Sequence, residues 1–514
     1  MNRRDIVKSA IFAAVSASAA AQEIHLEELT IEDIQKGFQS GLSAFGLTGA
    51  YLARIEAIDR HGPAINAVIE VNPDARKDAL ELDRERKAKG PRGPLHGVPV
   101  LVKDNIDTGN MSTTAGSLAL LGAPAPKDAF IVGRLRAAGA VLLGKTNLSE
   151  WANFRGEHST SGWSGRGGQT KNPYALNRNP SGSSSGSGAA ASASLCAVAV
   201  GTETDGSIVS PSSINGLVGI KPTVGLVSRS GIIPISASQD TAGPMARTVR
   251  DAVLLLNVLA AADSVDAATA AAPNPRPDYA QFLDKNGLRG ARLGIVRKSF
   301  GFNAAVDKLM EESITAMKSA GAEIIDPADI PPDGKIGEPE NEVLLYEFKA
   351  GLNAYFKTRG RADTLASLIS FNEKNRAREL DHFGQELLLK AEKKGPLTDA
   401  AYRKARAECI RLTRTEGIDA ACSKYRLQAL VAPTSCLAWF TDYINGDTGN
   451  GGCSTPPAVA GYPHITVPAG LVHGLPAGIS FFGPAWSEPA LIRVAYAFEQ
   501  ATKARRKPTF APSV

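Results

Sequence analysis

The chain has 514 residues, of which 43% are hydrophobic and 21% are charged, and it carries a formal net charge of +5 at pH 7. This length and composition are those of a globular protein with one large core or a few domains of average size. So small a net charge gives no reason to expect a nucleic-acid partner or attraction to an anionic membrane surface.

The first residues have the form of an export signal. They read MNRRDIVKSAIFAAVSASAAAQ, in which a basic start precedes a short apolar stretch and an A-x-A site at 19–21. This order is typical of a cleaved signal peptide over residues 1–21, and the pair Arg3-Arg4 resembles a twin-arginine signal. The apolar stretch is too short to cross a bilayer core of ~30 Å, so we expect no membrane span. The sequence therefore predicts an exported protein, periplasmic or secreted.

Strand-like and helix-like segments alternate along most of the remaining chain. Short apolar runs predict buried strands at 98–102, 140–143 and 479–482. Helical periodicity, with caps at Asn72 and Ser487 and a stop at Gly139, predicts helices at 73–90, 128–138, 246–263, 304–322 and 490–506. Such alternation predicts the α/β class, with a parallel or mixed central sheet covered by helices on both faces.

Two regions depart from this alternation. Residues 264–280 are rich in alanine and proline, which predicts an irregular surface connection. Residues 328–420 are richer in charged residues and helix formers, and we interpret them as a helical lobe rather than an independent domain. No internal repeat is found, so a solenoid or repeat architecture is not expected.

The stretch NPSGSSSGSG, residues 179–188, has the composition of a flexible tether. Its segment 182–186 also fits G-x-S-x-G, the nucleophile elbow of the α/β-hydrolases, with Ser184 at the centre. That elbow requires a preceding strand, and the residues before it read NRNP. The α/β-hydrolase interpretation is therefore disfavoured, whereas composition alone leaves open whether this stretch is a linker or a site.

A second formal motif, GAVLLGKT at 139–146, matches the phosphate loop G-x-x-x-x-G-K-T. Here the four residues between the glycines themselves form the predicted strand, and a helix rather than a strand precedes Gly139. A nucleotide-binding loop needs the opposite order, so we expect no nucleotide cofactor.

Metal and disulfide chemistry receive no support from the spacing of histidine and cysteine. No two of the seven histidines are four residues apart, and no two of the five cysteines form C-x-x-C, so neither a metal site nor a cofactor is predicted. The sequence leaves open whether Cys436 and Cys453 pair in an oxidising compartment. Cys196, in an apolar run, is interpreted as a small buried side chain.

Lys103 stands at the end of the predicted buried strand 98–102. Burial would lower the pKa of its ammonium group and make a neutral amine available as a base. The alternative is a lysine that extends from the strand end to water. Taken alone, the position favours this second interpretation.

The segment GTETDGSIVSPSS, residues 201–213, contains glycines that permit a tight turn. Backbone N–H groups of 204–207 are able to converge there as an anion-binding nest, with Ser207 presented at its tip. An ordinary capped loop is the alternative.

Taken together, three short motifs resemble the amidase signature family. They are Lys103-Asp104-Asn105 at a strand end, the G-S-S-S-G loop at 182–186, and Thr204-Asp205-Gly206-Ser207, with Ser183 and Ser207 separated by 24 residues as in the family. The likeness extends over nearly the whole mature chain, through segments such as GPLHGVPVLVKDNID, GLVGIKPTVGLVSRSGIIPIS, QDTAGPMARTV and GLPAGISFFG. It implies a single amidase signature domain over 22–514, with its signature core at about 95–225.

The resemblance implies a Ser–cis-Ser–Lys hydrolase. Ser207 would be the nucleophile that forms an acyl-enzyme, Ser183 would pass the proton, and Lys103 would be the neutral base. Backbone N–H groups of Thr204, Asp205, Gly206 and Ser207 would hold the oxyanion, and Ser184 and Asp104 would orient the relay. The chemistry is consistent, because a serine hydroxyl needs an adjacent base whose pKa lies near the working pH.

The likeness within the family also implies a substrate. The segments TETDGSIV, GWSGRGGQTKNPY and SEWANFRG most resemble bacterial peptide amidases, which implies hydrolysis of the C-terminal carboxamide of peptides. Asn153 is the candidate substrate contact. Val209 stands where many members carry an arginine, which argues against a small anionic substrate and against the A-type subunit of glutamyl-tRNA amidotransferase. The alternatives are an amidase for fatty, aryl or general aliphatic amides and a non-catalytic binding protein; the oligomeric state stays open.

Overall fold

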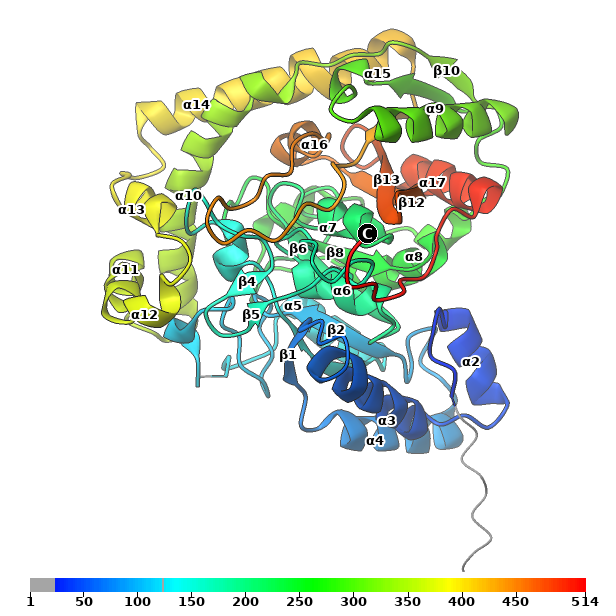
Figure 1. Cartoon of the computed structure of the whole chain (residues 1–514), viewed down its shortest axis with the longest axis vertical. Coiled ribbons are helices and arrows are strands. Elements are labelled where there is room, and N and C mark those ends of the chain that lie inside the picture. The colour runs from blue at the N-terminus through cyan, green and yellow to red at the C-terminus, as the bar shows by residue number, and fades with distance from the viewer. Residues whose placement is uncertain (1–23, 123) are drawn as a thin grey trace, which may run out of the picture.

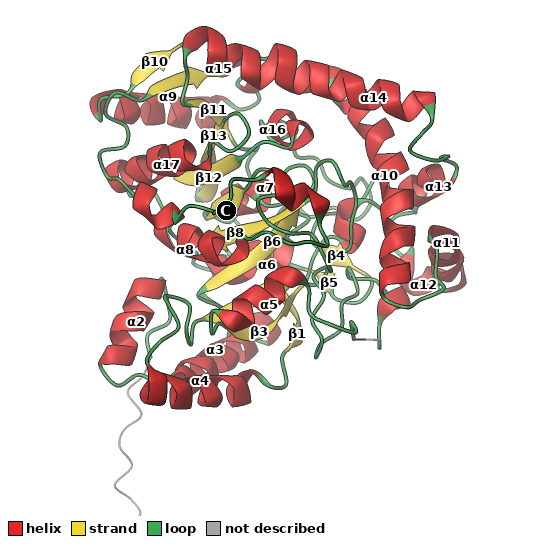
Figure 2. Ribbon diagram, turned by 180° about the vertical axis from the view of Figure 1, so that it is seen from behind, coloured by secondary structure: helices red, strands yellow, loops and turns green. Residues whose placement is uncertain are grey.

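A mixed sheet of 11 strands forms the centre of the molecule in the computed structural model, which describes residues 24–122 and 124–514. The strand order is β1-β3-β2-β6-β8-β7-β12-β13-β11-β9-β10, with parallel pairing of β2 with β3 and β6 and of β9 with β10 and β11. The other neighbours pair antiparallel. Helices cover both faces (Figures 1 and 2), so the predicted α/β class with a mixed sheet is confirmed. The predicted signal peptide lies outside the described residues.

The strands of the main sheet and of a two-stranded hairpin (β4 and β5) have the following bounds: β1 (Val68–Val71), β2 (Pro99–Lys103), β3 (Val141–Thr146), β4 (Trp163–Ser164), β5 (Gly168–Gln169), β6 (Val198–Glu203), β7 (Val218–Lys221), β8 (Thr241–Ala246), β9 (Arg292–Ile295), β10 (Glu323–Ile325), β11 (Ala429–Pro433), β12 (His464–Val472) and β13 (Leu475–Phe482).

The α-helices in the described part of the chain are α2 (Ile31–Gln39), α3 (Ala44–Arg54), α4 (Ala75–Lys89), α5 (Phe130–Ala137), α6 (Ser185–Ser192), α7 (Val209–Ile214), α8 (Val249–Leu259), α9 (Ala304–Ser319), α10 (Gly337–Thr358), α11 (Leu365–Lys374), α12 (Arg376–Glu379), α13 (Glu386–Glu392), α14 (Ala400–Ile410), α15 (Asp419–Tyr425), α16 (Thr455–Ala460) and α17 (Glu488–Thr502). None of the helices described is long and apolar enough to cross a membrane.

Most of the predicted elements are present, with shifted bounds. The strand predicted at 140–143 extends to Thr146, and the helix predicted at 246–263 begins only at Val249, because Ala246 still belongs to β8. Asn303 caps α9, its side chain accepting from two backbone N–H groups of the first turn. Of the predicted caps, Asn72 is replaced by Asp74 as N-cap of α4, and Ser487 is the N-cap of α17 but makes no side-chain capping bond. The region 264–280 contains two short 3₁₀ turns within an otherwise irregular connection.

The Gly/Ser stretch 179–188, which resembles a tether, is a loop up to Ser184 and then enters helix α6, which lies in the core. All eight residues of α6 are buried. A Cβ atom on Gly186 would lie 2.3 Å from the Ala67 carbonyl oxygen and 2.5 Å from that of Asn147, so only glycine fits there. The interpretation as a flexible linker is therefore wrong: small residues serve here for close packing of a helix on the sheet.

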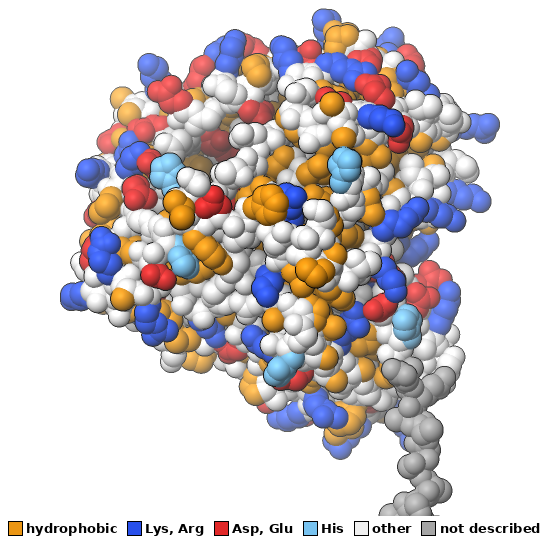
Figure 3. Space-filling model, in the orientation of Figure 1, with side chains coloured by type: hydrophobic (Ala, Val, Ile, Leu, Met, Phe, Trp, Pro, Cys, Tyr) orange, Lys and Arg blue, Asp and Glu red, His pale blue; other side chains and the backbone are white. Residues whose placement is uncertain are grey.

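Residues 328–420 fold into helices, of which α10 to α13 line the left edge of Figure 1 and α14 runs along its top. Arg155 fastens this lobe to the rest of the chain. Its buried guanidinium pairs with Glu150 at 2.6 Å and donates to the backbone carbonyls of Phe383 at 3.0 Å and Gly384 at 3.2 Å. Figure 3, drawn in the orientation of Figure 1, shows a hollow in its upper left part, near the positions of α10 and α16. Charged side chains of both signs surround this hollow.

Candidate active site

Lys103 is the last residue of β2, a strand whose five residues are all buried. Its Nζ lies 2.8 Å from Ser183 Oγ, 2.9 Å from Thr202 Oγ1 and 3.2 Å from the Thr202 carbonyl oxygen. Thr202 comes from β6, which pairs parallel with β2. The lysine does not extend to water, and its amine is held between two strands and the loop before α6.

Ser183 follows a cis peptide bond from Gly182 and lies just before α6. Ser184 joins the same loop to β6, because its Oγ accepts from the Thr202 N–H at 3.2 Å and lies 3.0 Å from the Thr202 carbonyl oxygen. The backbone N–H of Ser184 donates to the Ser207 carbonyl oxygen at 3.2 Å. These bonds bring the two predicted serines and Lys103 to one place in the core.

Ser207 lies in the turn between β6 and α7, where Gly206 adopts a φ of +74° that favours glycine. In the described part of the chain, the backbone N–H groups of Asp205, Gly206 and Ser207 have no protein acceptor. Such unoccupied, neighbouring N–H groups suit a developing oxyanion. Their role in catalysis stays a prediction.

Glu203, the last residue of β6, forms hydrogen bonds to the backbone just after Ser207. It was not identified from the sequence. Its buried Oε2 accepts from the N–H groups of Ile208 at 2.7 Å and Val209 at 3.0 Å, the two residues after Ser207. Burial raises the pKa of this carboxyl group, and Lys221 and the two N–H donors oppose the rise. A carboxylate there fixes the backbone that presents the serine.

Burial has a direct consequence for Lys103. Removal from water lowers the pKa of its ammonium group to about 7, although the negative charges of Glu203 and Asp240 oppose this change. At neutral pH, a large fraction of a lysine with this pKa is the neutral amine, which is the form that acts as a base. The environment therefore matches the task that the sequence assigns to Lys103.

Two other predicted residues lie in different surroundings. The carboxylate of Asp104 faces Thr114, Arg166 at 3.3 Å and Lys145 at 3.5 Å, so its contacts do not support a direct part in the relay. Asn153 ends a turn in which Trp151, Ala152 and Asn153 all have positive φ. Its Oδ1 accepts from Ser159 Oγ at 2.8 Å, and its contact with substrate stays a prediction.

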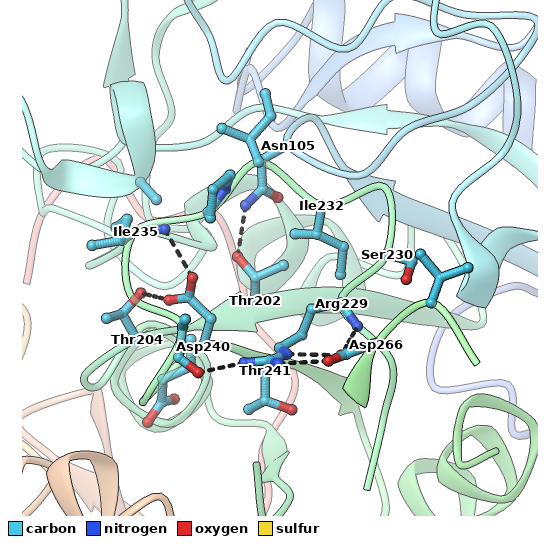
Figure 4. Close-up of a pocket in the computed structure, with 16 residues that line it drawn as sticks. Asn105, Thr202, Thr204, Arg229, Ser230, Ile232, Ile235, Asp240, Thr241 and Asp266 are labelled. Carbon is cyan, nitrogen blue, oxygen red and sulfur yellow. Dashed lines mark hydrogen bonds and ion pairs between the residues drawn. The ribbon is translucent and has the colours of Figure 1, made fainter. Parts of the chain in front are cut away.

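A pocket of about 230 Å³ lies beside Thr202 and Thr204 (Figure 4). Its walls combine the loop 229–241 with Asn105 and Ala152. Asp240 connects this loop to the turn that contains Ser207: its Oδ1 accepts from Thr204 Oγ1 at 2.6 Å, and its Oδ2 accepts from the N–H groups of Ile235 at 2.8 Å and Ser236 at 2.9 Å. Asp240 therefore positions the backbone of the proposed oxyanion site.

We expect Asp240→Asn to lower kcat roughly ten- to hundred-fold, with a smaller effect on KM, because a charge-assisted hydrogen bond to Thr204 is worth about 1.5–3 kcal/mol. Thr204→Val removes the hydroxyl group that donates this hydrogen bond. In a double-mutant cycle measured by steady-state kinetics, the two losses should therefore not add. Fully additive losses, or an unimpaired Asp240→Asn enzyme, would contradict this positioning role.

The comparisons with known proteins agree with this geometry. A family model named Amidase matches residues 46–492. The chain belongs to the amidase signature family.

Solved structures and curated relatives extend the match. A crystal structure of native peptide amidase from Stenotrophomonas maltophilia is 53% identical, with a TM-score of 0.90 over 94% of this chain and 99% of that one. A probable amidase of Arabidopsis thaliana is 43% identical over 94% of this amidase and 92% of the plant protein. The A-type subunit of the glutamyl-tRNA(Gln) amidotransferase of Symbiobacterium thermophilum is 35% identical over 90% of this chain and 94% of its own.

The structure also shows the surroundings of residues to which the sequence analysis assigned no functional role. Lys145 of the apparent phosphate loop lies within β3 of the amidase, fully buried, with its Nζ donating to the carbonyl oxygen of Ile106 at 2.7 Å. All five cysteines are free, Cys436 and Cys453 among them. In the ranges 24–122 and 124–514, no cluster of three His, Cys, Asp or Glu residues is arranged to hold a metal ion.

Proposed function

We propose that this amidase is an exported serine hydrolase that converts the C-terminal carboxamide of a peptide into a free acid and ammonia. The observation that carries the mechanism is the distance of 2.8 Å between Lys103 Nζ and Ser183 Oγ, in a site where the described hydrogen-bond partners of the amine are all uncharged. Export is proposed from residues 1–21 and suits a peptide substrate.

The contacts of Lys103 can be satisfied by a neutral amine. A neutral amine has two N–H bonds and one lone pair, and two of the three contacts of Nζ are oxygen atoms of Thr202. The N–H bonds are thereby used, and the lone pair is left for the hydroxyl proton of Ser183. Ser183 can then take the proton of Ser207 as Ser207 Oγ attacks the carboxamide carbon.

The remaining steps follow from the same groups. The tetrahedral oxyanion is held by the backbone N–H groups of 204–207. The proton on Lys103 returns through Ser183 to the leaving nitrogen, the C–N bond breaks and ammonia departs. Water then hydrolyses the acyl-Ser207 ester with the same groups acting as base and acid, which restores the enzyme.

Specificity for peptide amides is supported by the identity of 53% to a chain named as a peptide amidase. Val209 replaces the arginine found in many members, so no arginine follows the nucleophile by two residues to bind a small acid substrate. The same argument weighs against free glutamine, although glutamyl-tRNA amidotransferases also provide relatives of this chain.

Release of ammonia tests this proposal. We expect fast release from an N-blocked dipeptide amide and at least ten-fold lower kcat/KM for oleamide and for free glutamine. Equal or faster turnover of oleamide would instead support the alternative, an amidase for fatty or general aliphatic amides. Turnover of free glutamine, without turnover of the dipeptide amide or of oleamide, would contradict both the proposed function and this alternative.

A further inference from the structure

Two neighbouring residues of the loop 229–241, Gln239 and Asp240, both bind Thr204. Asp240 accepts from the Thr204 hydroxyl at 2.6 Å, as Figure 4 shows. Gln239 is buried, and its Nε2 donates to the Thr204 carbonyl oxygen at 3.3 Å. The bond from Asp240 thus holds the side chain of Thr204, whereas the bond from Gln239 holds its backbone.

The carbonyl of Thr204 belongs to the same peptide unit as the N–H of Asp205. This unit is trans, so its C=O and its N–H point in opposite directions within one plane. A donor that holds the carbonyl on one side therefore directs the N–H to the other side. The Asp205 N–H is one of the three in 205–207 that have no protein acceptor in the described part of the chain. The bond from Gln239 fixes the direction of this N–H.

A neighbouring peptide unit in the turn is held in a different way. The Gly206 carbonyl accepts from the N–H of Ser210 at 2.8 Å, at the start of α7, so the geometry of the helix fixes the direction of the Ser207 N–H. Thr204 lies after the end of β6 and before α7. Its carbonyl is therefore held by a side chain that lies 35 positions away along the chain.

A second acceptor fixes the orientation of the Gln239 amide. Its Nε2 also donates to Glu340 Oε1 at 2.8 Å, and Glu340 is buried. The amide nitrogen has two N–H bonds, and both of its partners are acceptors. A flip of the amide would place its oxygen against the oxygen atoms of Thr204 and Glu340. Glu340 therefore keeps Gln239 in the orientation that binds Thr204.

Glu340 lies in the first turn of α10, the helix of the lobe 328–420 at the left edge of Figure 1. Seven residues further on, Glu347 Oε2 accepts from Ser236 Oγ at 2.6 Å and from the Ser238 N–H at 2.9 Å. Residues seven apart lie on the same face of a helix. One face of α10 thus binds both Gln239 and the residues just before it.

We propose that Gln239 and Glu340 are positioning residues for the oxyanion site, which fix the Thr204–Asp205 peptide unit so that the Asp205 N–H faces the developing oxyanion. The inference rests on the Ser207 chemistry of the proposed function but not on its peptide specificity. It gives the helical lobe a part in catalysis, through α10.

The charge state of Glu340 suggests a conservative replacement. Burial and the neighbouring carboxylates of Asp205 and Asp333 raise the pKa of Glu340 well above its ordinary value, and the bond from Gln239 opposes this rise. The uncharged carboxyl group is therefore favoured, and its oxygen still accepts from Gln239. Glutamine is also uncharged and offers the same acceptor, so Glu340→Gln should preserve the function of this residue.

The experiment measures the binding of a transition-state analogue. Ser207 Oγ adds to the carbon of an aldehyde, the C=O double bond becomes a single bond to an oxyanion, and the hydroxyl proton passes through Ser183 to Lys103. The matching alcohol cannot form this adduct. Inhibition constants are measured for an N-blocked dipeptide aldehyde and its alcohol, and for octanal and octanol. For the pair that binds better, we expect the wild type to prefer the aldehyde by roughly 10²-fold or more.

Gln239→Leu should lower this aldehyde preference, and kcat, by about ten-fold or more with a smaller effect on KM, because loss of one oxyanion donor costs roughly 10²- to 10³-fold. Glu340→Leu should lower the preference by about three-fold or more, whereas Glu340→Gln should keep it within about two-fold of the wild type. Because the preference is a ratio of two inhibition constants, a loss of folded protein cancels. Glu340→Leu gives a second reading if Gln239→Leu does not fold.

Gln385→Leu is the matched control. Gln385 is also buried, and its Nε2 donates to the Ile369 carbonyl oxygen at 3.3 Å and to Glu373 Oε1 at 3.0 Å, just before α13. The control removes a similar pair of bonds and should lower the melting temperature, but it should leave the aldehyde preference unchanged. An equal loss of preference in the control, or no loss in both leucine variants of Gln239 and Glu340, would overturn the inference. A loss in Glu340→Gln as large as in Glu340→Leu would remove Glu340 from it.

The wild type separates this inference from the proposed function. If the wild type shows no preference for either aldehyde, Ser207 forms no tetrahedral adduct, and the proposed mechanism fails together with the inference. A strong preference in the wild type that stays equally strong in the variants would retain the proposed mechanism and overturn the inference alone. A preference seen with octanal but not with the dipeptide aldehyde would remove only the peptide specificity.

Discussion

Ser207→Ala is expected to lower kcat for a C-terminally amidated peptide by roughly 10⁴- to 10⁶-fold, the loss seen when a serine hydrolase loses part of its triad. The physical reason is that no acyl-enzyme can form without Ser207 Oγ. Mass spectrometry of the denatured enzyme after rapid mixing with substrate should detect the acyl adduct on the wild-type chain and none on the variant.

Ser210→Ala is the matched control for that substitution. Ser210 lies three residues further on, in α7, and its hydroxyl lies 2.9 Å from Ser181 Oγ. We expect the control to keep more than one-tenth of the wild-type kcat and to form the adduct. If Ser207→Ala kept a comparable activity, the nucleophile would have to be sought elsewhere.

Lys103→Met should lower kcat/KM by roughly 10²- to 10⁴-fold at neutral pH, the usual contribution of a general base. In the wild type, kcat/KM should rise with pH and level off above a midpoint near 7, because burial lowers the pKa of Lys103 to about 7 and only the neutral amine accepts a proton. The residual activity of the variant should lack this midpoint. Both are read from pH–rate profiles.

Lys221→Met tests whether the midpoint belongs to Lys103. Lys221 is also fully buried, and desolvation lowers its pKa to about 8, so its titration falls in a similar range. Whatever activity Lys221→Met retains should keep the midpoint near 7. A midpoint lost in this variant but kept in Lys103→Met would reverse the assignment.

The three predicted side chains were identified through the resemblance of their short motifs to the amidase signature family, because the position of Lys103 taken alone favoured a lysine that extends to water. Lys103 ends a run of buried residues, and Ser207 follows a glycine that permits the turn. The residues that hydrogen-bond to these side chains and to their loops could not be predicted from the sequence. Asp240 reaches Thr204 across 36 positions, and Thr202 reaches Lys103 across 99. Such long-range contacts depend on strand order, which no local pattern specifies.

Helix α6 and Asp104 illustrate two further limits of prediction from the sequence. The composition of α6 indicates flexibility, but the backbone carbonyls of Ala67 and Asn147 leave room only for glycine at Gly186. Proximity in sequence suggested that Asp104 orients the relay beside Lys103. Asp104 lies in the turn that follows β2, and its carboxylate faces Lys145 and Arg166.

The surroundings of Lys103 carry a consequence for the evolution of this protein. The hydrogen-bonding atoms around its amine are all uncharged oxygens, and the residue is fully buried at the end of β2. A buried lysine in such a place destabilises the fold whenever it is protonated, and an apolar residue of similar length would pack there more favourably. Selection for thermal stability alone would thus remove the residue that selection for activity must retain. A variant chosen only for its melting temperature is therefore expected to lose its base before it loses its fold.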